Sequence, residues 1–276
     1  MKINVFLVLL TTVIFTGCVT TKPIRYATTN QQTITVSSEQ ISAMTESGAG
    51  DYFIKDSQIT VGDARNATSS PVSGMFGLVG VGIATAIDKK SNSNAIEKST
   101  LNRPITFDKF VKNQVNELMS QKSSSNSSHL LTNDPTADIK LVPFSRLSLR
   151  EKSWMNVHFG MKSHFKNAAD QNASTKRFYQ YIGKNRATQS EWEANNNALF
   201  MQKADQAFTA LSEAFVLDLQ QKLKLNSFNP EKQAICQKTL ESINIFYIDS
   251  PENLCIGVSK TTKGKVLETT LFVADI

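Results

Sequence analysis

The clearest pattern in the chain is an alternation of apolar and polar residues from Trp154 to Lys166. One set is apolar and comprises Met155, Val157, Phe159, Met161 and Phe165. The other set is mostly polar or basic and comprises Trp154, Asn156, His158, Gly160, Lys162, His164 and Lys166. Because successive side chains of a strand point to opposite sides, this period of two predicts a long strand with one buried face.

The same alternation predicts a strand on either side of this one. Upstream, four apolar residues alternate with polar or basic ones: Ile139, Leu141, Leu147 and Leu149 with Lys140, Arg146, Ser148 and Arg150. Pro143 falls on the apolar side and indicates a bulge or an edge position. Downstream, Arg177 to Ile182 forms a third predicted strand. Three successive strands with modest connections predict an antiparallel meander.

Helical spacing of apolar residues predicts two long helices. The first covers roughly residues 106–121 and carries Phe107, Phe110, Val111, Val115 and Leu118 on one side. The second begins at a capping box formed by Thr188 and Glu191 and extends to about Leu225. Its core stripe comprises Met201, Ala204, Phe208, Leu211, Phe215 and Leu219. Asn195, Asn196 and Asn197 are poor helix formers and are expected to bend or fray its start.

The remaining elements are shorter. Thr33 to Val36 and Tyr52 to Val61 are predicted strands, and Asn229 with Pro230 marks the start of a short helix. The last predicted strands are Ile245 to Ile248, Cys255 to Ser259 and Val266 to Val273, the final two forming a hairpin. The whole order predicts an α+β fold. We expect an antiparallel sheet with a long meander covered by helices on one face, plus a small C-terminal α/β-hairpin appendage.

Gly74 to Ile87 is the most unusual internal stretch. Gly74, Gly77 and Gly80 recur at every third residue, so a helix would carry a stripe of small residues that permits close packing. A buried helix packed on the sheet is the simplest interpretation. A membrane-inserting or oligomerising helix is the alternative, because packed helices in lipid use such stripes. A phosphate-binding loop is disfavoured, because Thr85 stands where the third glycine of the motif belongs.

The chain opens with Lys2 and an almost uncharged run from Ile3 to Thr16, which is typical of a secretory signal. The run is shorter than the roughly 20 residues that a transmembrane helix needs. It ends at Phe15-Thr16-Gly17-Cys18, where small residues precede a cysteine. An ordinary signal peptide with an incidental cysteine is the alternative to a modified Cys18.

The four residues from Phe15 to Cys18 resemble the lipobox of bacterial lipoproteins, although Phe15 replaces the usual leucine. The resemblance implies that Cys18 is lipidated and becomes the new N-terminus. Val19, where inner-membrane lipoproteins often carry Asp, implies the outer membrane of a Gram-negative host, facing the periplasm. The expected organisation is a signal peptide (1–17), a lipidated tether (18–31), a main α+β domain (32–225) and a C-terminal appendage (226–276) packed on that domain.

Two cysteines remain beside Cys18, namely Cys236 and Cys255. An even pair in an exported protein predicts a disulfide, since that compartment is oxidising. Two separate buried thiols are the alternative. A metal site made of these two cysteines is poorly supported, because no histidine lies between or beyond them.

Charge singles out the meander. The chain has a net charge of +6, yet residues 140–186 alone contain ten Lys or Arg and two acids. Alternation places part of this charge on the side opposite the apolar residues, and Arg177 and Tyr179 would join it if the third strand buried Phe178 and Ile182. The candidate binding face comprises Lys140, Arg146, Arg150, Trp154, Lys162, Lys166, Arg177 and Tyr179. Such a face suits phosphate or carboxylate groups, although a solvated sheet face can carry the same charges without a ligand.

Known enzyme signatures are missing from the sequence, which lacks HExxH, CxxC, GxSxG and P-loop motifs. His158 and His164 share a strand face but lie about 20 Å apart by strand rise, too far to bind one metal ion. We therefore expect no cofactor, no metal site and no nucleic-acid partner, while an enzyme built from scattered residues stays open.

The element order loosely resembles that of periplasmic accessory lipoproteins, in which helices cover one face of a small antiparallel sheet. The resemblance implies an anchored accessory or assembly factor that binds an envelope protein. The alternatives are a module that binds anionic lipid or acidic glycan through its basic face, and an envelope enzyme with an unrecognised site.

Overall fold

The computed structural model describes residues 32–40, 51–63, 89–122, 129–151, 154–167, 170–240, 245–260 and 266–276. Cys18, the segments 1–17 and 18–31, and the stretch from Gly74 to Ile87 lie outside these residues. The same holds for the side chain of Arg150. Within this part of the chain, no helix is long and apolar enough to cross a membrane.

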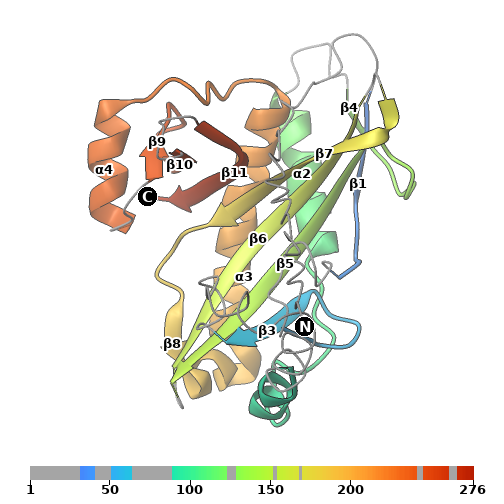
Figure 1. Cartoon of the computed structure of the whole chain (residues 1–276), viewed down its shortest axis with the longest axis vertical. Coiled ribbons are helices and arrows are strands. Elements are labelled where there is room, and N and C mark those ends of the chain that lie inside the picture. The colour runs from blue at the N-terminus through green and yellow to red at the C-terminus, as the bar shows by residue number, and fades with distance from the viewer. Residues whose placement is uncertain are drawn as a thin grey trace, which may run out of the picture.

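One mixed, mostly antiparallel sheet forms the centre of the molecule (Figure 1). Its strands are β1 (Gln32–Val36), β2 (Tyr52–Phe53), β3 (Ile59–Asp63), β4 (His129–Leu131), β5 (Ile139–Glu151), β6 (Trp154–Asn167), β7 (Asp170–Tyr181), β8 (Arg186–Thr188), β9 (Ile245–Tyr247), β10 (Leu254–Lys260) and β11 (Val266–Asp275). The helices are α2 (Asp108–Lys122), α3 (Gln189–Leu219) and α4 (Pro230–Leu240), and residues 89–96 are also helical. The predicted α+β class is thus confirmed.

The predicted meander is present as β5, β6 and β7, which pair in antiparallel order. The main strand order is β2-β3-β5-β6-β7-β11-β10-β9. The far side of β5 pairs in parallel with β1 up to Leu141 and with β3 from Ser145 onward. Pro143 lies between these two pairings, where the missing N–H of proline leaves no ladder bond unmade. It therefore marks the point at which β5 changes its neighbour.

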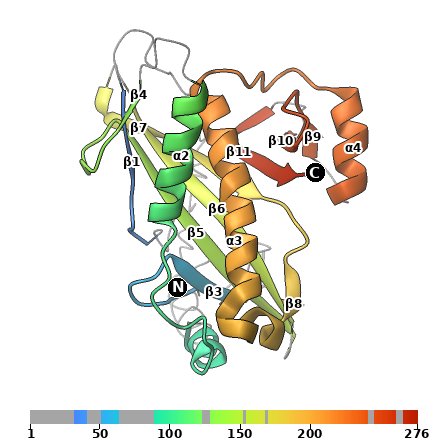
Figure 2. The same ribbon diagram turned by 180° about the vertical axis from the view of Figure 1, so that it is seen from behind.

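Helices α2 and α3 cover one face of the meander (Figure 2). The apolar set of β6 faces them, and all five of its predicted members are buried. Phe159 lies 5.6 Å from Phe200 and 5.8 Å from Phe208 between ring centroids, and Phe107 of the segment before α2 lies 4.7 Å from Phe208. The strand alternation and the helical stripe therefore meet in one core. We call the opposite side of β5, β6 and β7 the outer face.

The start of α3 is bent at the three asparagines. Thr188 and Glu191 form the predicted capping box, and the backbone of Asn195, Asn196 and Asn197 then adopts φ angles of 50°, 59° and 66°. Asparagine tolerates this left-handed region better than most residues. Beyond the bend, the predicted stripe is buried except for its first residue, Met201, which is 38% exposed.

The predicted boundaries of α3 and its stripe need two corrections. Helix α3 ends at Leu219, short of the expected Leu225, and Gln221 after it has a φ angle of 55°. Phe200 takes the core position that was assigned to Met201. Phe200 and Met201 are neighbours and lie four and three residues before Ala204, so helical spacing allows either to start the stripe and only the packing decides between them.

The C-terminal residues extend the main sheet. Strand β11 pairs in parallel with β7, and β10 and β9 follow it in antiparallel order. Residues 226–276 therefore share hydrogen bonds with the meander as well as packing on it. Side chains of β10 facing α3, such as Ile256 and Val258, join the main core. Those facing the other way pack with α4 around Tyr247 and Ala274.

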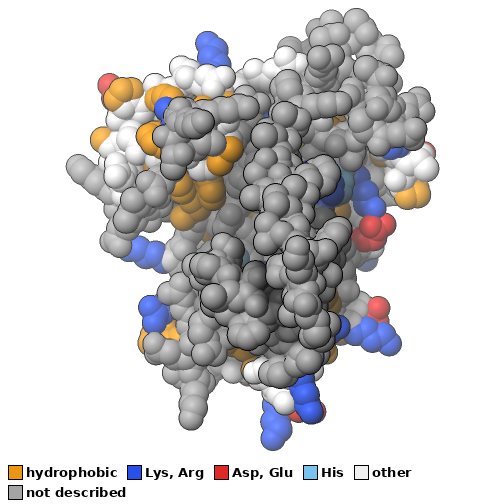
Figure 3. All heavy atoms as spheres, viewed as in Figure 1, with side chains coloured by type: hydrophobic (Ala, Val, Ile, Leu, Met, Phe, Trp, Pro, Cys, Tyr) orange, Lys and Arg blue, Asp and Glu red, His pale blue; other side chains and the backbone are white. Residues whose placement is uncertain are grey.

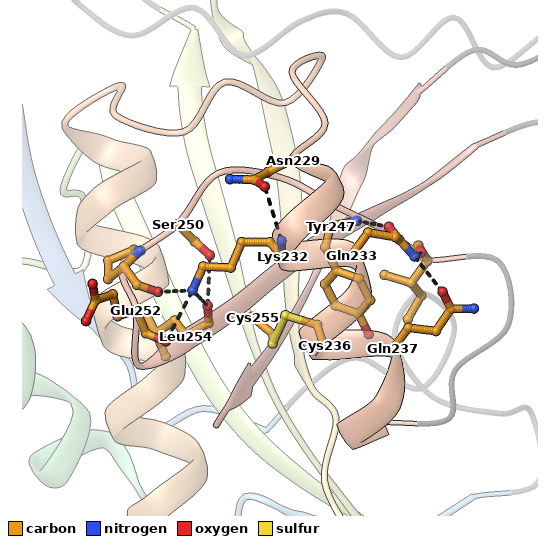
Figure 4. The surroundings of a disulfide bond; sticks show 12 residues. Asn229, Lys232, Gln233, Cys236, Gln237, Tyr247, Ser250, Glu252, Leu254 and Cys255 are labelled. Atoms are coloured by element: carbon orange, nitrogen blue, oxygen red, sulfur yellow. Dashed lines mark hydrogen bonds between the residues drawn. A yellow bond between two sulfur atoms is a disulfide. The ribbon is translucent and has the colours of Figure 1, made fainter.

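Cys236 of α4 and Cys255 of β10 form a disulfide, with their Cα atoms 5.8 Å apart (Figure 4). Beside it, the Lys232 ammonium donates to the backbone oxygens of Pro251, Glu252 and Leu254 at 2.6, 3.2 and 3.0 Å. The disulfide joins α4 to the C-terminal hairpin, as the two remaining cysteines predicted. In Figure 4, Lys232 extends from the side of α4 that carries Cys236 toward Glu252 and Leu254.

The edge strand β9 is capped by a side chain. The Gln233 amide donates to the carbonyl of Ile245 and accepts from the Tyr247 N–H, at 3.2 and 2.9 Å. These groups face away from β10, where a further strand would otherwise pair. The glutamine thereby occupies the open edge of the sheet, which is a common protection against strand addition.

Candidate functional site

Three basic side chains form one row across the outer face. The strand register places Lys140 of β5 beside His164 of β6, and His164 beside Lys176 of β7. Directly paired residues point to the same side of a sheet, with Cβ atoms about 5 Å apart. We call Lys140, His164 and Lys176 the basic row. In Figure 3, Lys or Arg and His side chains lie together at the right of this face, where Figure 1 places β1.

Lys162 lies next to the basic row on the same face of β6. Its side chain is 3% exposed, and its ammonium lies 5.7 Å from the centre of the Phe178 ring. Burial lowers its pKa to about 8, and the nearby Lys176 contributes to that shift. A lysine in such surroundings costs free energy in its charged form. Lys162 therefore adds positive charge to the site without offering an exposed contact.

His164 lies in the middle of the basic row and is half-buried. Burial, together with the charges of Lys162, Lys176 and Lys140, lowers its pKa to about 4, while Glu39 opposes the shift. At neutral pH the imidazole is therefore uncharged, and the two flanking lysines supply the charge of the row.

The pKa of His164 predicts a specific pH dependence of stability. As pH falls from 6.5 towards 4, the unfolded chain protonates this histidine while the folded chain does not. Protonation of the unfolded state lowers the free energy of unfolding across that window. We expect His164→Gln to lose less stability than the wild type over the same range, as measured by urea denaturation at several pH values. His158→Gln, at an exposed position of the same strand, is the matched control. Parallel curves for His164→Gln and the wild type would contradict the assignment.

Two acidic groups lie near the row but leave it basic. Glu39 accepts from the Lys140 ammonium at 2.6 Å, and its side chain is 65% exposed. Asp138 is occupied by the backbone N–H and hydroxyl of Thr33, both at 2.8 Å, which together with Lys166 hold its pKa below the usual value. Lys166 itself donates to the carbonyl of Thr136. The Lys166 ammonium is therefore held by the loop before β5 and does not form part of the basic row.

Arg146 has an acidic partner of its own. Its guanidinium donates to both carboxylate oxygens of Asp51, at 2.8 and 2.9 Å, and Asp51 is 3% exposed. Gly62 leaves room for this pair, since a Cβ atom there would come within 2.1 Å of the Asp51 carboxylate and 2.3 Å of Arg146. The charge of Arg146 is therefore engaged in tying β5 to the β2–β3 region.

The expectation that Arg177 and Tyr179 join the basic face was wrong. In the register, Arg177 pairs with Ser163 and Tyr179 with Met161, both on the buried side of β6. The two residues face α3, where Asp218 accepts a hydrogen bond from each. Phe178 and Lys176 occupy the outer face instead. The error followed from assuming that the apolar Phe178 must be buried.

Trp154 lies at the other end of the outer face, about 33 Å along β6 from the basic row by strand rise. Its side chain is 37% exposed, and the Arg186 guanidinium stacks 4.9 Å from its ring. The predicted face thus separates into two places. One is the basic row, which includes His164 and Lys176, two residues that were not among the predicted binding residues. The other is the Trp154 end, where Arg186 is an additional member that was not predicted.

Of the predicted binding residues, only Lys140 and Lys162 lie at the row, with Lys166 one pair further along the strands. The omitted Lys176 could have been found by extending the alternation of β7 backwards from Phe178.

Within the described ranges, no group of three or more His, Cys, Asp or Glu residues could hold a metal ion. Comparisons of the chain with protein-family models, curated proteins and solved structures found no match.

Proposed function

We propose that this chain is a lipid-anchored lipoprotein of the cell envelope that binds a partner protein as an accessory or assembly factor. Cys18 carries the lipid, and the polar residues after it tether the folded body at the outer membrane, facing the periplasm. The observation that carries the proposal is the order Phe15-Thr16-Gly17-Cys18 directly after a signal-like apolar run. The described fold begins later, at Gln32 of β1.

The Trp154 end of the outer face supports the partner-binding half of this proposal. Tryptophan and arginine are the residues most enriched among those that dominate protein–protein affinity. Here Arg186 stacks on Trp154, which holds both side chains in one arrangement before any partner arrives. Ordering a contact in advance reduces the entropy lost on binding. An exposed, pre-ordered pair of this kind suits a protein partner.

A photo-crosslinking experiment in intact cells tests the proposal. A photoreactive phenylalanine in place of Trp154 should capture one defined envelope protein. The same residue in place of Gln202, which is exposed on the helix side, should not. Cys18→Ser should abolish labelling with radioactive palmitate and release the chain from the membrane fraction, whereas Thr20→Ser should keep both.

Each half of the proposal has its own contrary result. Palmitate labelling that persists in Cys18→Ser would rule out the anchor. Equal capture from positions 154 and 202, or capture that Arg186→Glu does not reduce, would rule out partner binding at the Trp154 end.

A second candidate function, binding of an anionic lipid or acidic glycan, is favoured by a different observation. The basic row gathers three cationic or titratable side chains with Lys162 beside them. It lies far from the Trp154 end, so the two functions do not compete for one surface.

A further inference from the structure

We infer that one end of the folded body docks on a bilayer that contains anionic phospholipid. The contact surface comprises Lys222, Lys224, Phe228, Phe246 and Lys260, and we call it the Phe228 surface. Its residues come from the loop between α3 and α4, from β9 and from β10. The inference deepens the proposed function and rests on its anchor, because the anchor keeps the body beside a membrane.

Two exposed phenylalanines form the apolar part of the Phe228 surface. Phe228 is 37% exposed and Phe246 is 36% exposed, and their ring centroids lie 5.6 Å apart. A backbone bridge between Phe228 and Ile248 attaches the loop to the end of β9. Because the rings already face water, they can enter the boundary between lipid headgroups and acyl chains without a change in the fold.

Lys260 supplies positive charge at the same place. Its ammonium lies 3.5 Å from the centre of the Phe228 ring and 4.6 Å from that of Phe246. These cation–π contacts hold the charge beside the apolar rings. Asp249 lies near the same edge, where it accepts from the Asn229 amide at 3.3 Å. A lysine stem can lie among apolar groups while its ammonium stays at the polar boundary, so Lys260 can bind a lipid phosphate when the rings insert.

The loop after α3 extends the charge. Lys222 and Lys224 are exposed, whereas Leu223 between them is partly buried against the core. The N–H of Ser227 donates to the carbonyl of Lys224 at 2.9 Å, and this turn brings Lys224 close to the two rings. Residues 220–229 contain no Asp or Glu. The loop therefore presents positive charge, which an anionic membrane surface attracts.

The Phe228 surface lies at the end of the molecule where the described fold begins. Strand β1 starts at Gln32, paired with His129, and α3 ends at the same end (Figure 1, Figure 2). Figure 3 shows basic and apolar side chains there, along the loop between α3 and α4. Residues 18–31 span at most about 50 Å even when fully extended. A lipid at Cys18 would therefore keep this end within reach of the bilayer.

Docking at this end would also orient the proposed partner site. Strand β8, which carries Arg186, lies at the opposite end of the sheet (Figure 1). Arg186 stacks on Trp154 there. A body that contacts the bilayer through the Phe228 surface would direct the Trp154 end away from the membrane, where a soluble or envelope-spanning partner can reach it.

The test uses the full, lipidated chain in vesicles, with Phe228→Trp as a fluorescent reporter. The two native tryptophans, Trp154 and Trp192, lie at the start of β6 and the start of α3, far from this end, so the wild type is the matched control. Phosphatidylglycerol that is brominated in its acyl chains and mixed with phosphatidylcholine should quench the new tryptophan and leave the wild type unquenched. Brominated phosphatidylcholine alone should quench it much less.

Removing charge from the loop should release the surface. Each lysine near an anionic membrane strengthens binding about fivefold, so Lys222→Gln with Lys224→Gln should lower the ratio of docked to undocked protein about 25-fold. High salt should act in the same direction. Lys55→Gln with Lys184→Gln removes equal charge at exposed positions outside the Phe228 surface and should have no effect.

Three results would overturn the inference. These are quenching of the wild type as strong as that of Phe228→Trp, equal quenching by the two brominated lipids, and quenching that survives Lys222→Gln with Lys224→Gln. An equal loss in Lys140→Gln with Lys176→Gln would assign the lipid contact to the basic row instead.

A second reporter covers the case in which Phe228→Trp does not fold, as judged by circular dichroism. Asn226→Cys with an environment-sensitive fluorophore places the same readout on the exposed loop, since Cys236 and Cys255 are paired. A chain that floats with the vesicles but shows no quenching would refute docking alone. A chain that stays in solution would refute the anchor together with the docking that rests on it.

Discussion

Replacing Asp218 with alanine should lower the free energy of unfolding by about 3–5 kcal/mol. Asp218 is 3% exposed in α3 and accepts from the guanidinium of Arg177 at 2.5 Å and from the hydroxyl of Tyr179 at 2.7 Å. Arg177 is itself 2% exposed. Removing the carboxylate would leave a buried guanidinium without its counter-charge, which is far more costly than losing an exposed ion pair. Urea denaturation followed by circular dichroism measures the loss.

Two further variants separate charge from packing. Tyr179→Phe removes only the hydroxyl and should cost about 1 kcal/mol. Arg177→Met combined with Asp218→Leu replaces the pair by apolar side chains and should recover most of the stability lost in Asp218→Ala. A loss in Asp218→Ala no greater than that in Tyr179→Phe would show that the pair carries no unusual cost.

Replacing both Cys236 and Cys255 with alanine should lower the free energy of unfolding by about 3 kcal/mol. The two cysteines are 19 residues apart and both fully buried, so the bond closes a loop between α4 and β10. Opening this loop frees many conformations of the unfolded chain. The midpoint of thermal unfolding, recorded with and without reductant, measures the effect.

The reductant provides the control. The wild type should lose stability when reduced and approach the Cys236→Ala/Cys255→Ala variant, while that variant should not respond. An unchanged midpoint in wild-type protein whose thiols are shown to be reduced would mean that the bond does not stabilise this part of the sheet.

Local sequence patterns correctly predicted the features that depend on a single physical preference of neighbouring residues. The alternation from Trp154 to Lys166 predicted β6 and its buried face, because a strand exposed to water on one side must separate its residues by type. The capping box at Thr188 and the start of α4 at Pro230 were also confirmed, since caps depend on a few neighbouring residues. The bend at the three asparagines was found for the same reason.

The prediction that depended on how two strands pair was wrong. Arg177 and Tyr179 were placed on the outer face because Phe178 is more apolar than its neighbours. The pairing of β7 with β6 decided otherwise, and one residue of register moves every side chain to the opposite face. A buried carboxylate on α3 makes that register tolerable for arginine, and Asp218 lies 41 residues from Arg177.

The sequence by itself determined the local elements, the apolar side of the meander, the abundance of positive charge between residues 140 and 186, and the lipobox-like pattern at Cys18. Only the tertiary structure decided which charges remain available. It engaged Arg146 with Asp51 and Arg177 with Asp218, and it aligned Lys140, His164 and Lys176 across three strands. The physical reason is that charge is a property of each residue, whereas its neutralisation depends on partners brought near by folding.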